Sequence, residues 1–234
     1  ALDDAVKSIA VCDPAVGSGA FPVGMLTEIV RARSSLTPYF NEAGERTPYH
    51  FKRHAIQNCL YGVDIDPGAV EIAKLRLWLS LVVDEEDVKQ IKPLPNLDYK
   101  IVWGDSLLGF PFKSNRIIKI ESLKLRFFDE TNAGKKKALK REIDAEIEAA
   151  FASSKKSLGV GVSFDFEIFF SEVFHARQGF DVVIANPPYV SVEKFARTAQ
   201  QTEWKRRYKT FASRGDIYCF FYERGLGLLR EGGV

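Results

Sequence analysis

The sequence has little cysteine, histidine or methionine, and it lacks any long hydrophobic run. Among its 234 residues there are three Cys, three His and one Met. Cys12, Cys59 and Cys219 form no Cys-x-x-Cys pair, which argues against a disulfide framework and against a zinc site of that type. No stretch approaches the roughly 20 apolar residues of a membrane-spanning helix, and the acidic start Ala-Leu-Asp-Asp does not resemble a signal peptide. We therefore expect a soluble, cytoplasmic protein with no metal and no membrane partner.

Strong net charge is also absent, but the charges are unevenly distributed. The formal net charge is +2, with 33 basic and 31 acidic residues. Segment 190–214 nevertheless contains only Glu193 and Glu203 as acidic residues. Its basic residues are Lys194, Arg197, Lys205, Arg206, Arg207, Lys209 and Arg214. Such a basic stretch is typical either of a contact with a polyanion or of a solvated helix face.

Apolar runs and turn residues predict strands that alternate with helices. The expected strands are 8–12, 60–63, 99–103 and 181–185, the expected helices are 21–33, 67–83 and 217–229, and 231–234 resembles the turn into a fifth strand. This alternation favours an α/β fold, with a mostly parallel sheet and helices on both of its faces. The run 181–185 is uninterrupted, as in strands that are buried on both sides.

A charged segment, 113–178, interrupts this alternation. Leu139, Ile143 and Ile147 form a narrow apolar stripe at four-residue spacing among many charged residues, and Thr131–Gly134 contains turn residues. This pattern predicts a protruding helix or a helical hairpin that packs through one side only. We expect a single domain that carries 113–178 as an insertion.

A glycine-containing loop follows the first expected strand. It reads Asp13-Pro-Ala-Val-Gly17-Ser-Gly19-Ala-Phe21. Glycines let the backbone approach a ligand closely, and the following helix directs free N–H groups toward it. The same turn also occurs where a strand simply packs against a helix, so on its own it leaves both interpretations open.

The second and third expected strands also end at aspartates, Asp64 and Asp105. A carboxylate at the end of the second strand can accept both hydroxyls of an adenosine ribose. A carboxylate after the third strand can accept a hydrogen bond from an adenine amino group. Either aspartate alone could instead cap a helix. With Asp13, however, three acidic strand ends in order indicate an adenosine pocket along the carboxyl edge of the sheet.

The motif Asn186-Pro187-Pro188-Tyr189 directly follows the fourth expected strand. Two prolines stiffen the turn and remove two N–H donors, and Asn186 adds an amide oxygen. Two acceptors held together can bind both hydrogens of a planar amino group and direct its nitrogen lone pair at an electrophile. Tyr189 offers a flat face on which a base can stack.

Together these segments resemble the ordered motifs of S-adenosylmethionine-dependent DNA adenine-N6 methyltransferases. The likeness is carried by 13–21, by Tyr61-Gly-Val-Asp-Ile-Asp-Pro67, by Gly104-Asp-Ser-Leu107 and by Phe180–Tyr189. It is greatest for restriction–modification proteins in which nuclease and methylase are fused, and 215–233 is similar to the helix and turn after their catalytic motif. The resemblance implies a Rossmann-like methyltransferase fold of class I.

The resemblance also implies a role for each motif residue. The catalytic residues would be Asn186, Pro187 and Tyr189, which would hold and stack an adenine flipped out of duplex DNA. The S-adenosylmethionine site would comprise Asp13, Ala15, Gly17 and Gly19 at the methionine end, Asp64 and Ile65 at the ribose, and Asp105 and Ser106 at the adenine. Lys205, Arg206 and Arg207 would contact DNA phosphates.

The chain departs from the family pattern at both ends. The family has a helix before the first strand, where this chain has only Ala1–Lys7, and it has further strands and a target-recognition domain after position 234. We therefore interpret the chain as a truncated methyltransferase core with weak activity, whose parent protein supplies target recognition and, in a fused protein, a nuclease. Within the core, 1–112 would bind the cofactor and 179–234 would carry catalysis.

Other functions remain compatible with the motifs. The same amine clamp would serve RNA or a protein glutamine amide. The glycine loop with Asp64 could serve a nicotinamide-dependent dehydrogenase, although 17–22 reads Gly-Ser-Gly-Ala-Phe-Pro and lacks the third glycine of that fingerprint. A non-catalytic DNA-docking module is the remaining alternative.

Overall fold

The computed structural model describes residues 1–40, 46–83, 96–109, 116–152 and 161–234. They form two compact units, of which unit 1 contains Ala1–Trp103, Gln178–Pro187 and Gly225–Val234, and unit 2 contains Gly104–Arg177 and Pro188–Arg224. The boundary expected at 112/113 lies outside the described residues, so the three-part division stays a prediction. Among the described helices, none is both long enough and apolar enough to cross a membrane.

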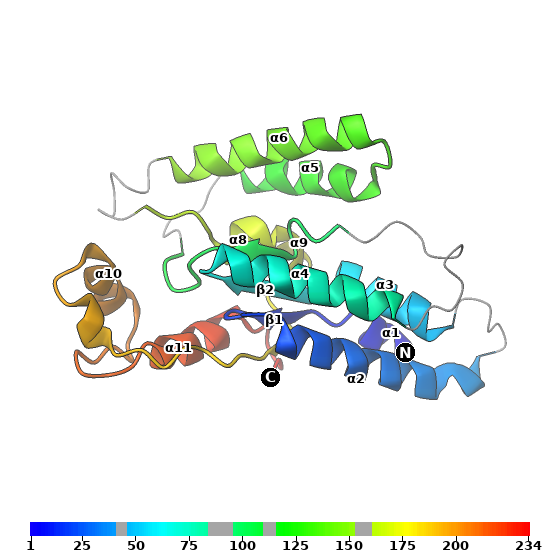
Figure 1. The fold of residues 1–234 in the computed structure, drawn as a ribbon, viewed down its shortest axis with the longest axis horizontal. Coiled ribbons are helices and arrows are strands. Elements are labelled where there is room, and N and C mark those ends of the chain that lie inside the picture. The colour runs from blue at the N-terminus through cyan, green and yellow to red at the C-terminus, as the bar shows by residue number, and fades with distance from the viewer. Residues whose placement is uncertain (41–45, 84–95, 110–115, 153–160) are drawn as a thin grey trace. The chain divides into compact units, whose positions relative to one another are not determined.

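Unit 1 contains a sheet of four parallel strands in the order β3-β2-β1-β4, of which β1 and β2 are labelled in Figure 1. The strands are β1 (Val11–Asp13), β2 (Leu60–Asp64), β3 (Ile101–Trp103) and β4 (Val182–Val183). Val11 lies opposite Leu60 on one side and opposite Val182 on the other. The predicted α/β fold with a parallel sheet is confirmed, and the strand order is that of a Rossmann-like fold.

Three helices of unit 1 share one apolar core with the sheet. They are α2 (Ala20–Leu36), α3 (Pro48–Asn58) and α4 (Pro67–Val82). The core combines Leu26 of α2, Ile56 of α3 and Leu77 of α4, all fully buried, with strand residues. The start of α4 follows from its sequence, because the Asp66 carboxylate accepts the Gly68 N–H at 2.8 Å and proline suits the first helical position.

The last strand, β4, is shorter and more exposed than its sequence predicts. Only Val182 and Val183 are in strand conformation, and both are half-buried rather than buried on both faces. It is the last strand in the order of the four-stranded sheet. Beyond it, the Val234 N–H donates to the Asp181 carbonyl at 2.9 Å, and the Val234 carbonyl accepts from Val183 at 2.8 Å. The chain after the predicted turn therefore does return alongside β4.

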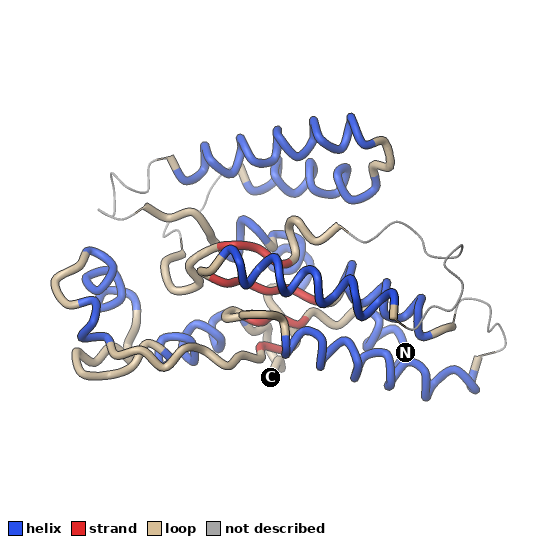
Figure 2. Tube along the Cα trace, in the orientation of Figure 1, coloured by secondary structure: helices blue, strands red, loops and turns tan. Residues whose placement is uncertain are grey.

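In unit 2, the predicted helical hairpin is formed by α5 (Ile117–Asp129) and α6 (Ala133–Phe151), which lie side by side (Figures 1 and 2). The Asn132 side chain caps α6 by accepting the Lys135 N–H at 3.1 Å. The stripe Leu139, Ile143 and Ile147 is buried, as expected. Two short helices follow, α8 (Phe166–Phe169) and α9 (Ser171–Arg177).

A hydrophobic cluster of unit 2 surrounds Trp204, which is 1% exposed. It combines η3 (Val192–Phe195), α10 (Ala199–Arg207) and the first part of α11 (Tyr218–Leu228). Phe220 of α11 contacts both Trp204 and Tyr208 with its ring, at centroid distances of 5.5 Å and 5.0 Å. The tail of basic residues in α10 is therefore attached to a well-packed aromatic core.

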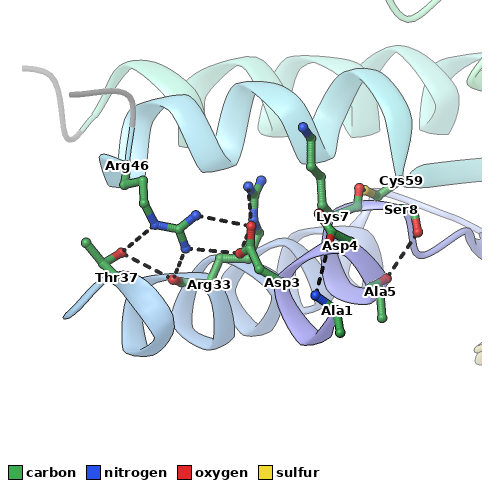
Figure 3. Close-up of polar contacts among 10 residues, drawn as sticks. All are labelled: Ala1, Asp3, Asp4, Ala5, Lys7, Ser8, Arg33, Thr37, Arg46 and Cys59. Atoms are coloured by element: carbon green, nitrogen blue, oxygen red, sulfur yellow. Dashed lines mark hydrogen bonds and ion pairs between the residues drawn. The ribbon is translucent and has the colours of Figure 1, made fainter. Parts of the chain in front are cut away.

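The segment before β1 forms a short helix, α1 (Leu2–Lys7), that is joined to α2 by buried charges (Figure 3). The Asp3 carboxylate accepts hydrogen bonds from Arg33 of α2 at 3.1 Å and from Arg46 at 3.0 Å. The two guanidinium groups also lie over aromatic rings, Arg46 at 3.8 Å from the Phe40 centroid and Arg33 at 4.4 Å from that of Phe51. Hydrogen bonds from Arg46 and Arg33 hold the pKa of Asp3 well below its ordinary value.

Replacing Asp3 should destabilise unit 1. The variant Asp3→Ala leaves the buried guanidinium of Arg33 without its carboxylate, and we expect a loss of about 2 kcal/mol in the free energy of unfolding. The control Glu28→Ala removes an exposed pair with Arg31 on α2 and should cost less than about 0.5 kcal/mol. Urea titrations of both variants measure this difference, and equal effects would contradict the structural role of Asp3.

Candidate active site

The loop after β1 is held against β2 by its own backbone. The Val16 N–H donates to the Val63 carbonyl at 2.9 Å, and the side chain of Val16 fills the space beside Gly62, where an added Cβ would lie 2.7 Å from it. Gly17 and Gly19 have φ values of +50° and +84°, a region that favours glycine. At Gly19 an added Cβ would also come within 3.0 Å of Ala73 on α4. Gly17 and Gly19 therefore have left-handed backbone conformations, and the loop packs closely against β2 and α4.

The Asp64 carboxylate connects this loop to the end of β2. One of its oxygens accepts the Gly17 N–H at 2.8 Å, and the other accepts the Asp66 N–H at 2.9 Å. The side chain is only partly buried, and a carboxylate can accept further hydrogen bonds. Asp64 thus fixes the glycine loop and retains acceptor capacity.

Asp13, the last residue of β1, is 1% exposed and only half satisfied. Its Oδ1 accepts the Ala15 N–H at 3.0 Å, whereas its Oδ2 has no hydrogen-bond partner among the described residues. Burial raises the pKa of Asp13 to about 7, and the nearby charge of Asp64 acts in the same direction. A buried acceptor without a donor is uncommon and costs stability, so this oxygen is suited to a ligand that brings a donor or a positive charge.

Two large apolar side chains are exposed beside these carboxylates. Ile65 follows Asp64 and is 64% exposed, and Trp103 ends β3 and is 55% exposed. The indole N–H of Trp103 donates to the Ile65 carbonyl at 2.9 Å, which fixes the ring at this strand end. Ile65 was expected at the site, whereas Trp103 was not. Its signal in the sequence was a bulky aromatic residue directly before Gly104-Asp105.

The predicted adenine-binding residues Asp105 and Ser106 lie at the start of unit 2 and are largely covered. Asp105 Oδ1 accepts the Leu107 N–H at 2.8 Å, and Oδ2 accepts the Gln200 side-chain amide at 3.0 Å. Burial raises the pKa of Asp105, while these hydrogen bonds oppose the increase. Ser106 is 4% exposed. Sequence reasoning missed Gln200, because no local signal connects residues 95 positions apart.

In unit 1, Asn186 and Pro187 leave the sheet at the edge where the glycine loop leaves it. β4 runs parallel to β1 with Val183 opposite Cys12, and the Ile184 N–H still donates to the Cys12 carbonyl at 3.0 Å. Asn186 follows two residues later and is exposed. Parallel neighbours end at the same edge of a sheet, so Asn186 and Asp13 both lie at the carboxyl edge.

In unit 2, Tyr189 is 74% exposed and contacts another tyrosine. Its ring lies 5.5 Å from that of Tyr218 at the start of α11. Hydrogen bonds from Val192 to the Gly215 carbonyl and from Ile217 to the Val190 carbonyl, both 2.9 Å, hold the two segments together. Tyr189 therefore presents its ring to solvent from a fixed backbone.

The three cations expected to contact DNA differ in their surroundings. Lys205 and Arg206 are exposed, whereas the side chain of Arg207 is only 17% exposed. Arg207 bonds to Glu203 at 3.2 Å and also donates to the Gly109 carbonyl. Glu203 accepts from Arg206 as well, at 2.8 Å. Lys205 and Arg206 are consequently better placed than Arg207 to reach an external phosphate.

The predicted site residues are thus divided between the two units. Unit 1 contains the glycine loop, Asp64, Ile65, Asn186 and Pro187, and unit 2 contains Asp105, Ser106, Tyr189 and the basic end of α10. Over the described ranges, no group of three or more His, Cys, Asp or Glu residues is arranged to hold a metal ion.

The chain is similar to several known proteins, and each of these relatives is named as a type II methyltransferase. Over 111 residues the chain is 43% identical to a protein of Methanocaldococcus jannaschii that is named a putative type II restriction enzyme and methyltransferase, and the match covers 46% of the chain and 9% of that protein. Over 234 residues it is 24% identical to a type II restriction enzyme and methyltransferase of Escherichia coli, covering 94% of the chain and 19% of that protein. A type II methyltransferase of Xanthomonas vasicola is 43% identical over 54 residues, covering 23% of the chain and 10% of that protein.

The chain therefore spans about a fifth or less of the length of these relatives. The family described as Eco57I restriction-modification methylase matches residues 58–234, which include β2, β3, β4 and the Asn-Pro-Pro-Tyr motif. Because this match covers most of the chain, we conclude that the chain belongs to the Eco57I restriction-modification methylase family.

Proposed function

We propose that this chain transfers a methyl group from S-adenosylmethionine to the N6 amine of an adenine flipped out of duplex DNA. The observation that carries the proposal is the position of Asn186-Pro187 at the carboxyl edge of the sheet, where the loop of Asp13 also begins. Membership in a restriction-modification methylase family supports methyl transfer and a DNA substrate. It leaves the alternative of a nicotinamide-dependent dehydrogenase without support.

The residues of unit 1 fit the methionine and ribose parts of S-adenosylmethionine. Asp13 offers a buried oxygen without a donor, which suits the cationic amine of a methionine. Gly17 and Gly19 have left-handed backbone conformations, and the N-terminus of α2, which has no side-chain cap, would direct backbone N–H groups toward the methionine carboxylate. Asp64 would accept the ribose hydroxyls, with Ile65 packed on the sugar or the base. When bound, the cofactor supplies a methyl group on a positively charged sulfur.

Asp105 and Ser106 would bind the adenine of the cofactor. The Asp105 carboxylate already accepts an amide N–H from Gln200, which is the kind of donor that an adenine amino group presents. The raised pKa of Asp105 results from burial, and a hydrogen bond from adenine would compensate part of that desolvation.

The Asn186 side chain and the Pro187 carbonyl would accept the two hydrogens of the target amine. This grip holds the nitrogen lone pair toward the methyl group, so that catalysis consists mainly of positioning. Tyr189 would stack on the flipped base, and stacking of about 1–3 kcal/mol per base offsets part of the few kcal/mol that flipping costs. Neither side chain needs to ionise in this scheme.

The parent protein would contribute the remaining functions. Since the chain spans only a small part of relatives named as restriction enzyme and methyltransferase, we propose that target recognition lies in other segments, and that a nuclease is fused where the parent resembles those relatives. The isolated chain should then methylate DNA weakly and with little sequence preference.

The variant Asn186→Ala tests the amine clamp. In the complete protein we expect the rate of methyl transfer to duplex DNA to fall about a hundredfold or more, comparable to the loss of one oriented polar group elsewhere. Affinity for S-adenosylmethionine should stay unchanged, since in this proposal the Asn186 side chain contacts the target amine and not the cofactor. Mass spectrometry of the digested product should identify N6-methyladenine. Methylation of cytosine, RNA or a protein glutamine instead, or full activity of the variant, would contradict the proposal.

Replacing Asp13 should remove a pH-dependent loss of stability. Between the ordinary pKa of 3.8 and the folded value of about 7, the folded chain keeps the Asp13 proton that the unfolded chain releases. The free energy of unfolding therefore falls as the pH rises through this window, by at most about 1.4 kcal/mol per pH unit, and is constant above it. Asp13→Asn should lack this fall and melt higher than the unchanged chain at about pH 8.

Asp4→Asn, at an exposed position of α1, is the matched control and should keep the original pH profile of thermal melting. Calorimetry on the same proteins adds a second readout. Because a cationic amine favours the ionised carboxylate, affinity for S-adenosylmethionine should rise with pH through about 7 and should be weaker and flat in Asp13→Asn. Identical melting profiles, or donor binding that is unaffected by the variant, would refute this assignment.

Charge reversal at the exposed end of α10 should weaken DNA binding through the phosphates. For Lys205→Glu with Arg206→Glu, the slope of log affinity against log salt should decrease by about 0.9 for each contact that is lost. Arg207 is left unchanged, because it bonds within unit 2. The control Lys7→Glu with Arg31→Glu changes the net charge equally in unit 1. Equal salt slopes for both double variants would place the DNA contact elsewhere.

A further inference from the structure

Three tyrosines of unit 2 form a row of neighbouring rings outside its buried core. The rings of Tyr189 and Tyr218 lie 5.5 Å apart, and those of Tyr218 and Tyr222 lie 5.9 Å apart with an edge-to-face angle of 83°. Tyr189 is 74% and Tyr222 is 69% exposed, with Tyr218 partly covered between them. We call Tyr189, Tyr218 and Tyr222 the tyrosine row.

The backbone fixes the row in place. Tyr218 and Tyr222 are one helical turn apart on α11, so their side chains project from the same face. The opposite side of this turn is anchored, because Ile217 and Phe220 are buried in the cluster around Trp204. Tyr189 is aligned with this face by the hydrogen bonds that join 190–192 to 215–217. The row is therefore a preformed surface whose two outer rings, those of Tyr189 and Tyr222, are largely exposed.

The charges around the row suit a polyanion. Lys194 and Arg214, next to the two paired segments, are exposed, and the side chain of Arg214 is 91% exposed and lies 3.7 Å from Glu193. The acidic Asp216 lies near Tyr218. Exposed aromatic rings beside cations are the combination that single-stranded nucleic acids bind, because bases stack on the rings while the cations neutralise the backbone.

We propose that the tyrosine row binds unpaired nucleobases of a DNA strand, and that Tyr222 holds a nucleotide next to the one that Tyr189 receives. This inference rests on the proposed DNA substrate and extends it to the strand that flanks the target. Tyr218 acts as a positioning residue, because its ring supports both neighbours. Stacking depends on no particular base edge, so the row contributes affinity with little sequence preference.

The test compares Tyr222→Ala with Tyr222→Phe in binding to a short single-stranded oligodeoxyadenylate at several salt concentrations. Tyr222→Ala should weaken binding about tenfold at every salt concentration, since stacking and not charge is removed. Tyr222→Phe should bind as the unchanged protein does, because it keeps the aromatic face. The control is Tyr39→Ala, which removes a tyrosine that is 84% exposed in unit 1.

Thermal melting of each variant verifies that the fold is retained. Unchanged binding by Tyr222→Ala, an equal loss with Tyr39→Ala, or a loss that disappears at high salt would overturn the proposal. Calorimetry with S-adenosylmethionine on the same proteins separates this outcome from a failure of the proposed function. If the donor does not bind to the unchanged protein, the methyltransferase proposal fails, whereas the oligonucleotide result still decides the role of Tyr222.

Discussion

The parallel pairing of β1 with β2 and β4 is the constraint on which the candidate site depends. Strands that run in the same direction end at one edge, so the residues that follow them meet there although they are far apart in sequence. Asp13, Asp64 and Asn186 occupy this edge in unit 1. The Asp64 carboxylate then fixes the glycine loop through the Gly17 N–H. Sheet direction thus determines which groups can face one ligand.

Two buried aspartates of unit 1 differ in how far the fold compensates their charge. Asp3 is paired with two arginines, and its pKa is held low, so the charge is compensated within the fold. Asp13 is buried with one oxygen unpaired, and its pKa is raised to about 7. A fold gains nothing from the second arrangement. The unpaired oxygen lowers the stability of the fold. In the methyltransferase proposal, the bound cofactor supplies the missing hydrogen-bond donor.

The sequence predicted what depends on local pattern and chain order, and it missed what depends on distant contacts. The α/β fold and the helical hairpin around Leu139 follow from apolar periodicity and from turn residues. The helix of Ala1–Lys7 is stabilised by Asp3 across 30 and 43 positions, so no local signal could reveal its anchor. The hydrogen bonds from Arg207 to Gly109 and from Gln200 to Asp105 were missed for the same reason, because each joins residues that are far apart in the sequence. The uninterrupted apolar run 181–185 predicts a strand that is buried on both faces, and it does not reveal that only Val182 and Val183 form a strand and are half-buried.

The most direct test of the central claim is a crystal structure of the protein with bound S-adenosylhomocysteine. We predict that the amine of its methionine part donates to Asp13 Oδ2, that its ribose hydroxyls contact Asp64, and that its sulfur faces Asn186. A ligand bound away from the β1 and β2 strand ends, or one that leaves Asp13 Oδ2 without a donor, would contradict it.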